Sequence, residues 1–286
     1  MKSGFVALAG RPNVGKSTLV NALCGGKVAI VSDKPQTTRH RVRGVVDGEG
    51  YQLVLIDLPG FQRPRDALTE RMQRTVDEAL ADVDGIVLVL AADERIGPGD
   101  RFVAQRVFAG PAPVVIALNK VDRLRPAQIA EQIERAAALG DFRALHPVSA
   151  HTGDGVRALR DEVVELLPEG PPYFPVGELT DAPLELRIAE LVREKALELT
   201  REEVPHAITV DVEEVGDRRV TASVLVETAS QKQIVVGKGG SMIKEIGVRA
   251  RPEIEFLLGR PIFLELRVKV KPRWRRDDAL LERLGL

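Results

Sequence analysis

Apolar positions in the first 168 residues follow two patterns that alternate along the chain. Runs of strand length occur at Phe5–Ala9, Gly85–Ala91, Pro113–Leu118 and Arg143–Val148. Segments with helical periodicity fill the gaps: Lys16–Cys24, Thr69–Asp82, Asp100–Ala109, Pro126–Ala138 and Gly155–Leu167. Arg41–Asp47 and Tyr51–Asp57 flank Gly48-Glu49-Gly50, which predicts an antiparallel hairpin. Strands alternating with helices predict an α/β fold, with a doubly wound, mostly parallel sheet covered on both faces.

The pattern changes at Pro168–Gly177, where ten residues contain four prolines and two glycines. Such a segment neither packs nor continues a helix, so we predict a first domain at 1–168, a linker at 169–178 and a second domain at 179–286. In the second domain we expect a helix, two strands, a short apolar segment with a glycine turn, a helix and a last strand. The expected ranges are Pro183–Arg201, His206–Glu213, Arg219–Glu227 and Ile262–Val270. This order predicts a smaller α+β domain.

Charge is distributed unevenly in the second domain. The whole chain has a net charge of −1, but 178–217 carries −8 and 218–276 carries +9. The basic block is either a polyanion site or a solvated face. The single cysteine, Cys24, cannot form an internal disulfide and is expected to pack in a helix. The apolar runs fall far short of the roughly 20 residues that span a bilayer, and the first strand begins almost at Met1, so we expect a cytoplasmic protein.

A phosphate-binding loop follows the first strand. Its sequence matches GxxxxGK[ST], and a strand precedes it and a helix follows it, as this motif requires. The residues expected around the phosphates are Gly10, Arg11, Pro12, Asn13, Val14, Gly15, Lys16, Ser17 and Thr18. The glycines allow backbone N–H groups to point at phosphate oxygens, and the helix contributes its positive N-terminal end. Lys16 is expected to bridge the β- and γ-phosphates, and Ser17 to ligate Mg²⁺.

Three later motifs, each at the end of a strand, indicate which base is bound and how the phosphate is sensed. In Asp57-Leu58-Pro59-Gly60, Asp57 is expected to hold Mg²⁺ and the Gly60 N–H to contact the γ-phosphate. In Asn119-Lys120-Val121-Asp122, the Asp122 carboxylate can accept both the N1–H and the 2-amino hydrogen of guanine, while Asn119 supports the base edge. Ser149-Ala150 offers the Ala150 N–H to guanine O6. Together the motifs predict a GTP- and GDP-binding enzyme that hydrolyses GTP.

These motifs, with GRPNVGKSTLVNAL, QTTRHRVRG, PEGPPYFP, EEVPH and LELRVKVKPRW, resemble the translation-factor-related bacterial GTPases of the Era family over essentially the whole chain. The resemblance implies a P-loop GTPase domain followed by a prokaryotic-type KH domain. It also implies that Thr37 or Thr38 reaches Mg²⁺ when GTP is bound, and position in the QTTR motif favours Thr38. Phe61 follows Gly60 where Ras-like enzymes carry a water-orienting glutamine, so we expect slow intrinsic hydrolysis catalysed through Lys16, Thr38 and Gly60. Asn13 resembles a ligand for K⁺ beside the phosphates; the alternative is that it only braces the loop.

The second domain contains Gly237-Lys238-Gly239-Gly240, which resembles the GxxG loop that lets a KH domain approach an RNA backbone. Lys232 and Lys244 lie nearby in sequence. Ile234, Val235, Val236, Ile243 and Ile246 are candidates for the groove wall, although at least two of them should belong to the core. Pro252 falls inside the expected following helix, which should kink or restart there.

The last expected strand leads into a basic segment with six basic residues between Arg267 and Arg276. Arg273 is a candidate phosphate contact, and Trp274 either stacks on a base or packs in the core. The resemblance implies binding to single-stranded ribosomal RNA near the 3′ end of the small-subunit RNA and a nucleotide-gated role in assembly of that subunit. We also expect a weak peripheral membrane association. Two alternatives are a protein that uses GTP only as a conformational latch and a membrane-associated signalling GTPase.

Overall fold

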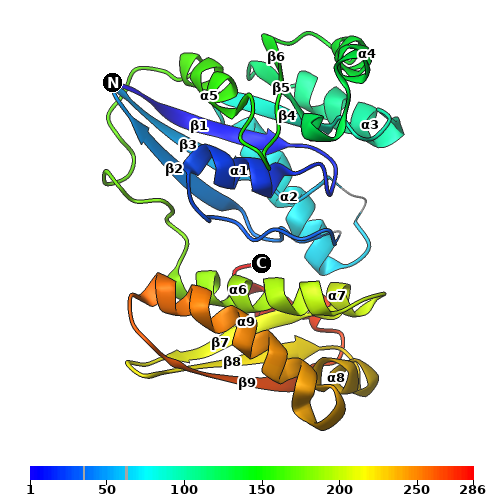
Figure 1. Cartoon of the computed structure of the whole chain (residues 1–286), viewed down its shortest axis with the longest axis vertical. Coiled ribbons are helices and arrows are strands. Elements are labelled where there is room, and N and C mark those ends of the chain that lie inside the picture. The colour runs from blue at the N-terminus through cyan, green and yellow to red at the C-terminus, as the bar shows by residue number, and fades with distance from the viewer. Residues whose placement is uncertain (35, 62–63) are drawn as a thin grey trace. The chain divides into compact units, whose positions relative to one another are not determined.

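The computed structural model describes residues 1–34, 36–61 and 64–286, which form two compact units (Figure 1). The first unit comprises Met1–Val31, Thr38–Arg65 and Thr69–Asp181. The second comprises Ser32–Thr37, Asp66–Leu68 and Ala182–Leu286. Within the described part of the chain, no helix is both long enough and apolar enough to cross a membrane.

The first unit is built on one sheet with the strand order β2-β3-β1-β4-β5-β6. β2 and β3 form the predicted antiparallel hairpin, and every other pairing in the sheet is parallel. The strands are β1 (Lys2–Ala9), β2 (Val42–Gly48), β3 (Tyr51–Asp57), β4 (Gly85–Ala91), β5 (Val114–Asn119) and β6 (Ala144–Pro147). β4 is buried along its whole length, as a central parallel strand covered on both faces must be. The predicted α/β class is confirmed.

Helices cover both faces of this sheet (Figure 1). They are α1 (Lys16–Cys24), α2 (Ala67–Ala81), α3 (Pro98–Phe108), α4 (Pro126–Ala137) and α5 (Val156–Glu165), with a 3₁₀ turn at Val121–Arg123. Side chains of α1 and α5 pack on one face and those of α2, α3 and α4 on the other, which gives two apolar layers. Cys24 is packed beside β2, and burial raises the pKa of its thiol to about 12, which agrees with a packing role.

The proline-rich stretch after α5 is held by the first unit. The backbone N–H groups of Tyr173 and Phe174 donate to Oε1 of Gln52 at 2.7 and 2.9 Å. The Tyr173 ring also lies 4.6 Å from the Phe5 ring, measured between centroids. The expectation that this stretch does not pack is therefore wrong, although a division of the chain at 169–178 stays a prediction.

The second unit is an α+β domain in which two helices that the sequence pattern does not predict, 204–207 and 229–236, precede the glycine turn. Its elements are α6 (Leu184–Leu199), α7 (Val204–Ala207), β7 (Thr209–Val215), β8 (Arg219–Val226), α8 (Ala229–Val236), α9 (Ser241–Leu258), β9 (Phe263–Val270), a 3₁₀ turn at Trp274–Arg276 and α10 (Asp278–Arg283). The sheet has the order β7-β8-β9, with β7 antiparallel and β9 parallel to β8. Residues of α6 and α9 form its core with the sheet.

Two local expectations for this unit are wrong. The segment expected to be only a short apolar stretch before the glycine turn is α8, which begins with a capping box in which Thr228 and Gln231 satisfy each other's backbone N–H groups. Its Ile-Val-Val end resembles a strand in sequence, but tertiary packing places Val235 in the core as part of a helix. Likewise α9 does not restart at Pro252. The helix is continuous because Pro252 lies on its exposed side, where the missing backbone bond leaves a carbonyl that water can reach.

Candidate functional site

The phosphate loop joins β1 to the first turn of α1, so Gly10–Thr18 lie together at the carboxyl end of the parallel strands. Gly15 precedes the helix with φ = 96°, a left-handed conformation that glycine adopts without strain. A Cβ atom at Gly15 would also collide with Nδ2 of Asn119. The loop and the base-reading strand end therefore touch at Gly15, and the unpaired N–H groups at the start of α1 provide an anion site.

Lys16 is buried beneath the loop. Its Nζ donates to the carbonyl oxygens of Gly10 and Arg11 at 3.1 and 2.9 Å. Burial lowers the pKa of Lys16 to about 8, although the nearby Asp57 carboxylate raises it. The ammonium group is thus held where phosphates would arrive, at a cost in desolvation that negative phosphate oxygens would offset.

This burial predicts a pH dependence for nucleotide binding. Phosphate charge must raise the pKa of Lys16, so binding takes up a proton above about pH 8 and affinity falls there. We expect the Kd for GDP, measured by calorimetry, to rise about fourfold between pH 7 and pH 8.5. A Kd that stayed constant over this range would mean that Lys16 is fully charged in the free protein.

The predicted magnesium ligands meet beside Lys16. Ser17 Oγ donates to Oδ2 of Asp57 at 2.6 Å and lies 2.9 Å from Oγ1 of Thr38, which itself donates to Asp57 Oδ2 at 3.2 Å. Asp57 is fully buried, which raises its pKa, while the hydrogen bond from Ser17 and the charge of Lys16 lower it. Its Oδ1 is buried without a hydrogen-bond partner among the described residues. Two hydroxyls and a carboxylate with an unsatisfied oxygen fit a hard cation such as Mg²⁺. The Thr37 hydroxyl instead donates to the Lys34 carbonyl.

The segment after β3 approaches the phosphate loop through its backbone. A Cβ atom at Gly60 would lie 2.9 Å from the Pro12 nitrogen, so a larger residue would push the two loops apart. Leu58 and Phe61 are buried in the apolar layer under the sheet. The Phe61 side chain is therefore structural, and this position supplies no polar group to orient a water molecule.

The base-reading residues extend from the ends of β5 and β6. Nδ2 of Asn119 donates to the Val14 carbonyl at 3.0 Å, and its Oδ1 accepts the Ala150 N–H at 3.0 Å, which fixes the base loop to the phosphate loop. The expected contact of this N–H with guanine O6 therefore requires that its bond to Asn119 be shared or released. Ser149 is buried, and its Oγ accepts the Thr152 N–H at 3.1 Å. Asp122 is exposed, and its carboxylate has no ion pair or hydrogen bond within the described ranges.

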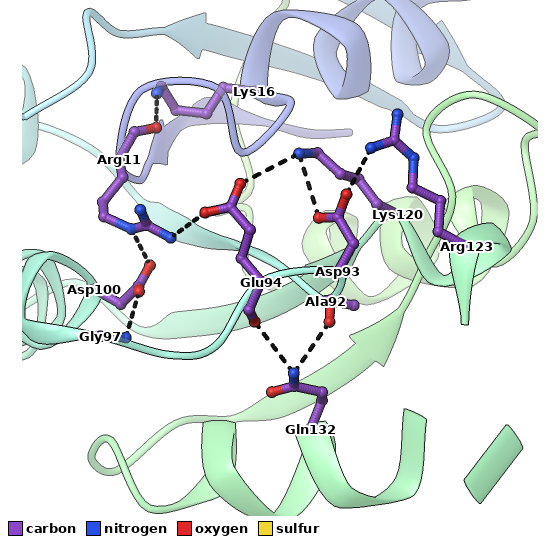
Figure 2. A network of polar contacts seen from close by, with 10 residues as sticks. All are labelled: Arg11, Lys16, Ala92, Asp93, Glu94, Gly97, Asp100, Lys120, Arg123 and Gln132. Carbon is purple, nitrogen blue, oxygen red and sulfur yellow. Dashed lines mark hydrogen bonds and ion pairs between the residues drawn. The ribbon is translucent and has the colours of Figure 1, made fainter. Parts of the chain in front are cut away.

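An acidic segment, which no sequence motif revealed, lies between the phosphate loop and the base-reading loop. Asp93, Glu94 and Asp100 contact Arg11, Lys120 and Arg123 (Figure 2). The Arg11 side chain, expected to lie around the phosphates, is directed to Asp100 and Glu94 instead, so only its backbone remains for the nucleotide. No spacing rule links residues more than 80 positions apart, and only the sheet topology brings them together.

A second candidate site lies in the α+β unit at the turn between α8 and α9. A groove there is lined by Ala229, Lys232, Gln233, Val236, Gly237 and Lys238. Lys232, Lys238 and Lys244 are exposed, and in the described part of the chain none of their ammonium groups has an ion-pair partner. Val235 and Ile246 belong to the core, as expected for at least two of the candidate wall residues.

Most of the remaining basic block is neutralised locally. Lys269 pairs with Glu213 at 2.5 Å, Lys271 with Asp277 at 3.1 Å and Arg275 with Glu227 at 2.6 Å. Trp274 is fully buried, and its Nε1 donates to the Ala207 carbonyl at 2.7 Å. The prediction that Trp274 stacks on a base is therefore wrong, whereas Arg273 is exposed at the turn. In the α8–α9 turn, by contrast, the lysines around Gly237–Gly240 keep their charge unpaired within the described residues.

The phosphate loop, the base-reading strand ends and the helix–glycine turn–helix define a P-loop GTPase that carries a KH domain. Residues 5–120 match the family of 50S ribosome-binding GTPases, and residues 203–275 match the KH domain family. GTPase Era of Mycobacterium bovis BCG is 48% identical over 99% of this chain and 98% of its own length. GTPase Era of Nocardioides is 47% identical over 99% of this chain and 96% of its own length. The chain belongs to the GTPase Era family and is a GTPase.

Two solved Era structures have the same fold as this chain over its whole length. A point variant of Aquifex aeolicus Era bound to GDP and AlF₄⁻ superposes with a TM-score of 0.96 and 39% identity, covering 100% of this chain and 99% of that one. An Era complex with MgGDPNP and nucleotides 1506–1542 of 16S ribosomal RNA gives a TM-score of 0.94 and 40% identity, covering 100% and 99%.

Proposed function

We propose that this GTPase binds single-stranded ribosomal RNA near the 3′ end of the small-subunit RNA, and that its GTP cycle gates this binding during assembly of the small subunit. The observation that carries the proposal is the groove at Gly237–Gly240, which is lined by Lys232 and Lys238 and followed by exposed Lys244 in α9; none of the three has an ion-pair partner among the described residues. A KH groove takes about four unpaired bases while its glycine loop admits the backbone. The complex of an Era relative with 16S ribosomal RNA supports this choice of RNA.

For hydrolysis, we propose that Ser17, Thr38 and Asp57 hold Mg²⁺, which supplies positive charge to the β- and γ-phosphates when bound. Lys16 adds a positive charge that is fixed before the nucleotide arrives, and the N–H groups of the phosphate loop orient the phosphates. The Gly60 N–H would contact the γ-phosphate. Because Phe61 is buried and Arg11 is held by Asp100, neither orients water nor stabilises the transferred group, so intrinsic turnover is slow.

Asn13 is the proposed ligand for a K⁺ ion that supplies part of the missing charge. It is exposed in the phosphate loop and has a left-handed φ of 65°. We expect hydrolysis to slow several-fold when Na⁺ replaces K⁺, and Asn13→Ala to remove this difference. Equal single-turnover rates of the unmodified protein in the two salts would show that Asn13 only braces the loop.

RNA capture tests the proposed gating. The full-length protein, loaded with GDP or with a non-hydrolysable GTP analogue, would be incubated with total RNA, and the bound RNA sequenced. We expect enrichment of the 3′ end of small-subunit RNA in one nucleotide state over the other. Equal enrichment in both states would contradict gating, and an absence of enrichment would contradict RNA binding.

Single-turnover GTP hydrolysis on the same preparation tests the two alternatives. A rate unchanged by the captured RNA would favour a conformational latch. The predicted peripheral membrane association is tested with anionic liposomes: stimulation of hydrolysis by liposomes and not by RNA would favour a membrane-associated GTPase.

A further inference from the structure

The segment between β4 and α3 touches both ends of the nucleotide site, although none of the motifs includes it. Figure 2 shows acidic side chains of this segment between Arg11 of the phosphate loop and Lys120 of the base-reading loop. Both loops bind the same ligand, one at its phosphates and the other at its base. Groups that connect them can therefore affect how well the two subsites match one nucleotide.

On the phosphate side, Arg11 is fixed by two carboxylates. Its Nε donates to Oδ1 of Asp100 at 2.7 Å, and a terminal nitrogen donates to Oε2 of Glu94 at 3.0 Å. Asp100 is almost fully buried, and its second oxygen accepts the Gly97 N–H at 2.9 Å at the N-terminal cap of α3. Burial makes the Arg11–Asp100 pair a fixed anchor for the loop.

On the base side, the partner is Lys120, which directly follows Asn119 and has a left-handed φ of 69°. Its Nζ lies 3.4 Å from Oδ1 of Asp93 and 3.8 Å from Oε1 of Glu94. Asp93 also pairs with Arg123 through Oδ2 at 2.6 Å. Lys120 and Arg123 flank Asp122, so these ion pairs hold the turn that presents the guanine-reading carboxylate.

The backbone of the segment is anchored as well. Nε2 of Gln132, from α4, donates to the carbonyl oxygens of Ala92 and Glu94 at 3.1 Å each. The Ala92 N–H donates to the Asn119 carbonyl at 2.7 Å. Glu94 therefore projects from a fixed backbone, and it alone in Figure 2 uses one carboxylate oxygen toward Arg11 and the other toward Lys120.

We propose that Glu94 is a positioning residue that couples the phosphate loop to the base-reading loop and thereby raises the affinity for the intact guanine nucleotide. A ligand that occupies two subsites gains affinity when they are held at its own span, because less ordering is left to complete on binding. The carboxylate contributes only through Arg11 and Lys120, so it should change ground-state binding and not the hydrolysis step.

The test is the steady-state kinetics of Glu94→Gln. We expect KM for GTP and the dissociation rate of GDP each to rise about fivefold. This factor lies at the lower end of the range for coupling between two sites, because Glu94 is half exposed and solvent weakens its ion pairs. The kcat should stay near that of the unmodified protein, and inhibition by inorganic pyrophosphate, which occupies only the phosphate subsite, should be unchanged. Added salt should accelerate GDP release from the unmodified protein more than from the variant.

Two further variants serve as controls, one at Glu94 itself and one at a separate ion pair. Glu94→Asp keeps the charge but is one methylene shorter and should not reach both partners, so it should behave like Glu94→Gln. Glu162→Gln removes an ion pair of the same kind, with Arg143 at 2.7 Å, and should change none of these quantities. An unchanged KM and GDP release rate in Glu94→Gln would overturn the proposal. Equal losses of affinity for GDP and pyrophosphate in Glu94→Gln would also overturn it, because the effect would then be local to the phosphate loop. Unchanged kinetics in Glu94→Asp would overturn it too, because the effect would then depend on charge alone.

Discussion

Asp122→Asn should change the preferred nucleotide from guanosine to xanthosine. In the predicted guanine site the Asp122 carboxylate would accept two hydrogens from the base. Asparagine instead presents an oxygen and an NH₂ group, which match the N1–H and the 2-oxo group of xanthine. A site built on such hydrogen bonds rejects a mismatched base by about 10⁴-fold. We therefore expect the Kd for GTP to rise by roughly this factor, and xanthosine triphosphate to bind more tightly than GTP.

The fold should tolerate this change. Asp122 is exposed and has no partner among the residues that the structure describes, so its substitution removes no internal contact. Asp141→Asn, which alters an exposed aspartate just before β6, at the end of the sheet away from the motifs, is the matched control and should leave both affinities unchanged. Titration of each variant with fluorescent GTP and xanthosine triphosphate measures the preference. An unaltered GTP affinity in Asp122→Asn would refute the assignment of the guanine site.

Substitution of both Lys238 and Gly239 by Asp should weaken RNA binding strongly and leave GTP binding unchanged. The change replaces Lys238, a cation with no ion-pair partner in the described part of the chain, with an anion and adds a second anion at the turn where phosphates would pass. We expect RNA affinity to fall at least about tenfold, and the slope of log affinity against log salt to fall by about 0.7 for each lost cationic contact. Any stimulation of hydrolysis by RNA should disappear.

The geometry of the turn allows this double variant. Gly239 has φ = 61° with open space around its Cβ position, and aspartate enters the left-handed region more readily than most residues. The control variant carries Arg251→Asp, in the second half of α9, and Gly259→Asp, just after its last residue, which together make the same change in charge away from the glycine turn. Gly259 also has a left-handed φ, 66°, and open space.

Both double variants would be tested with an oligonucleotide from the 3′ end of small-subunit RNA across a salt series, and with GTP on the same preparations. Equal losses of RNA affinity in the two would mean that the contact is diffuse, and no loss in either would remove the groove from the RNA site. A loss of GTP affinity would show that the two sites depend on each other.

The sequence by itself determined the features that depend on neighbouring residues. The phosphate loop is specified by a glycine before a lysine at the start of a helix, and the strands by continuous apolar runs such as Gly85–Ala91, which matches β4 residue for residue. The strand ends carrying Asp57, Asn119 and Ala150 could then be placed together, because parallel strands share one carboxyl edge. Local chemistry and one topological rule are sufficient for these residues.

Tertiary structure alone decided features that depend on distant partners. α8 has a strand-like Ile-Val-Val end, and only packing against the sheet selects the helix that its capping box begins. Trp274 has a basic neighbourhood in sequence, yet its indole finds a carbonyl 67 positions away, at Ala207, and is fully buried. Arg11 lies within a phosphate-binding motif, but two acids brought close by α3 and its preceding loop draw the side chain away. In each case the favourable contact is between segments that only the folded chain brings within reach, so no local pattern encodes it.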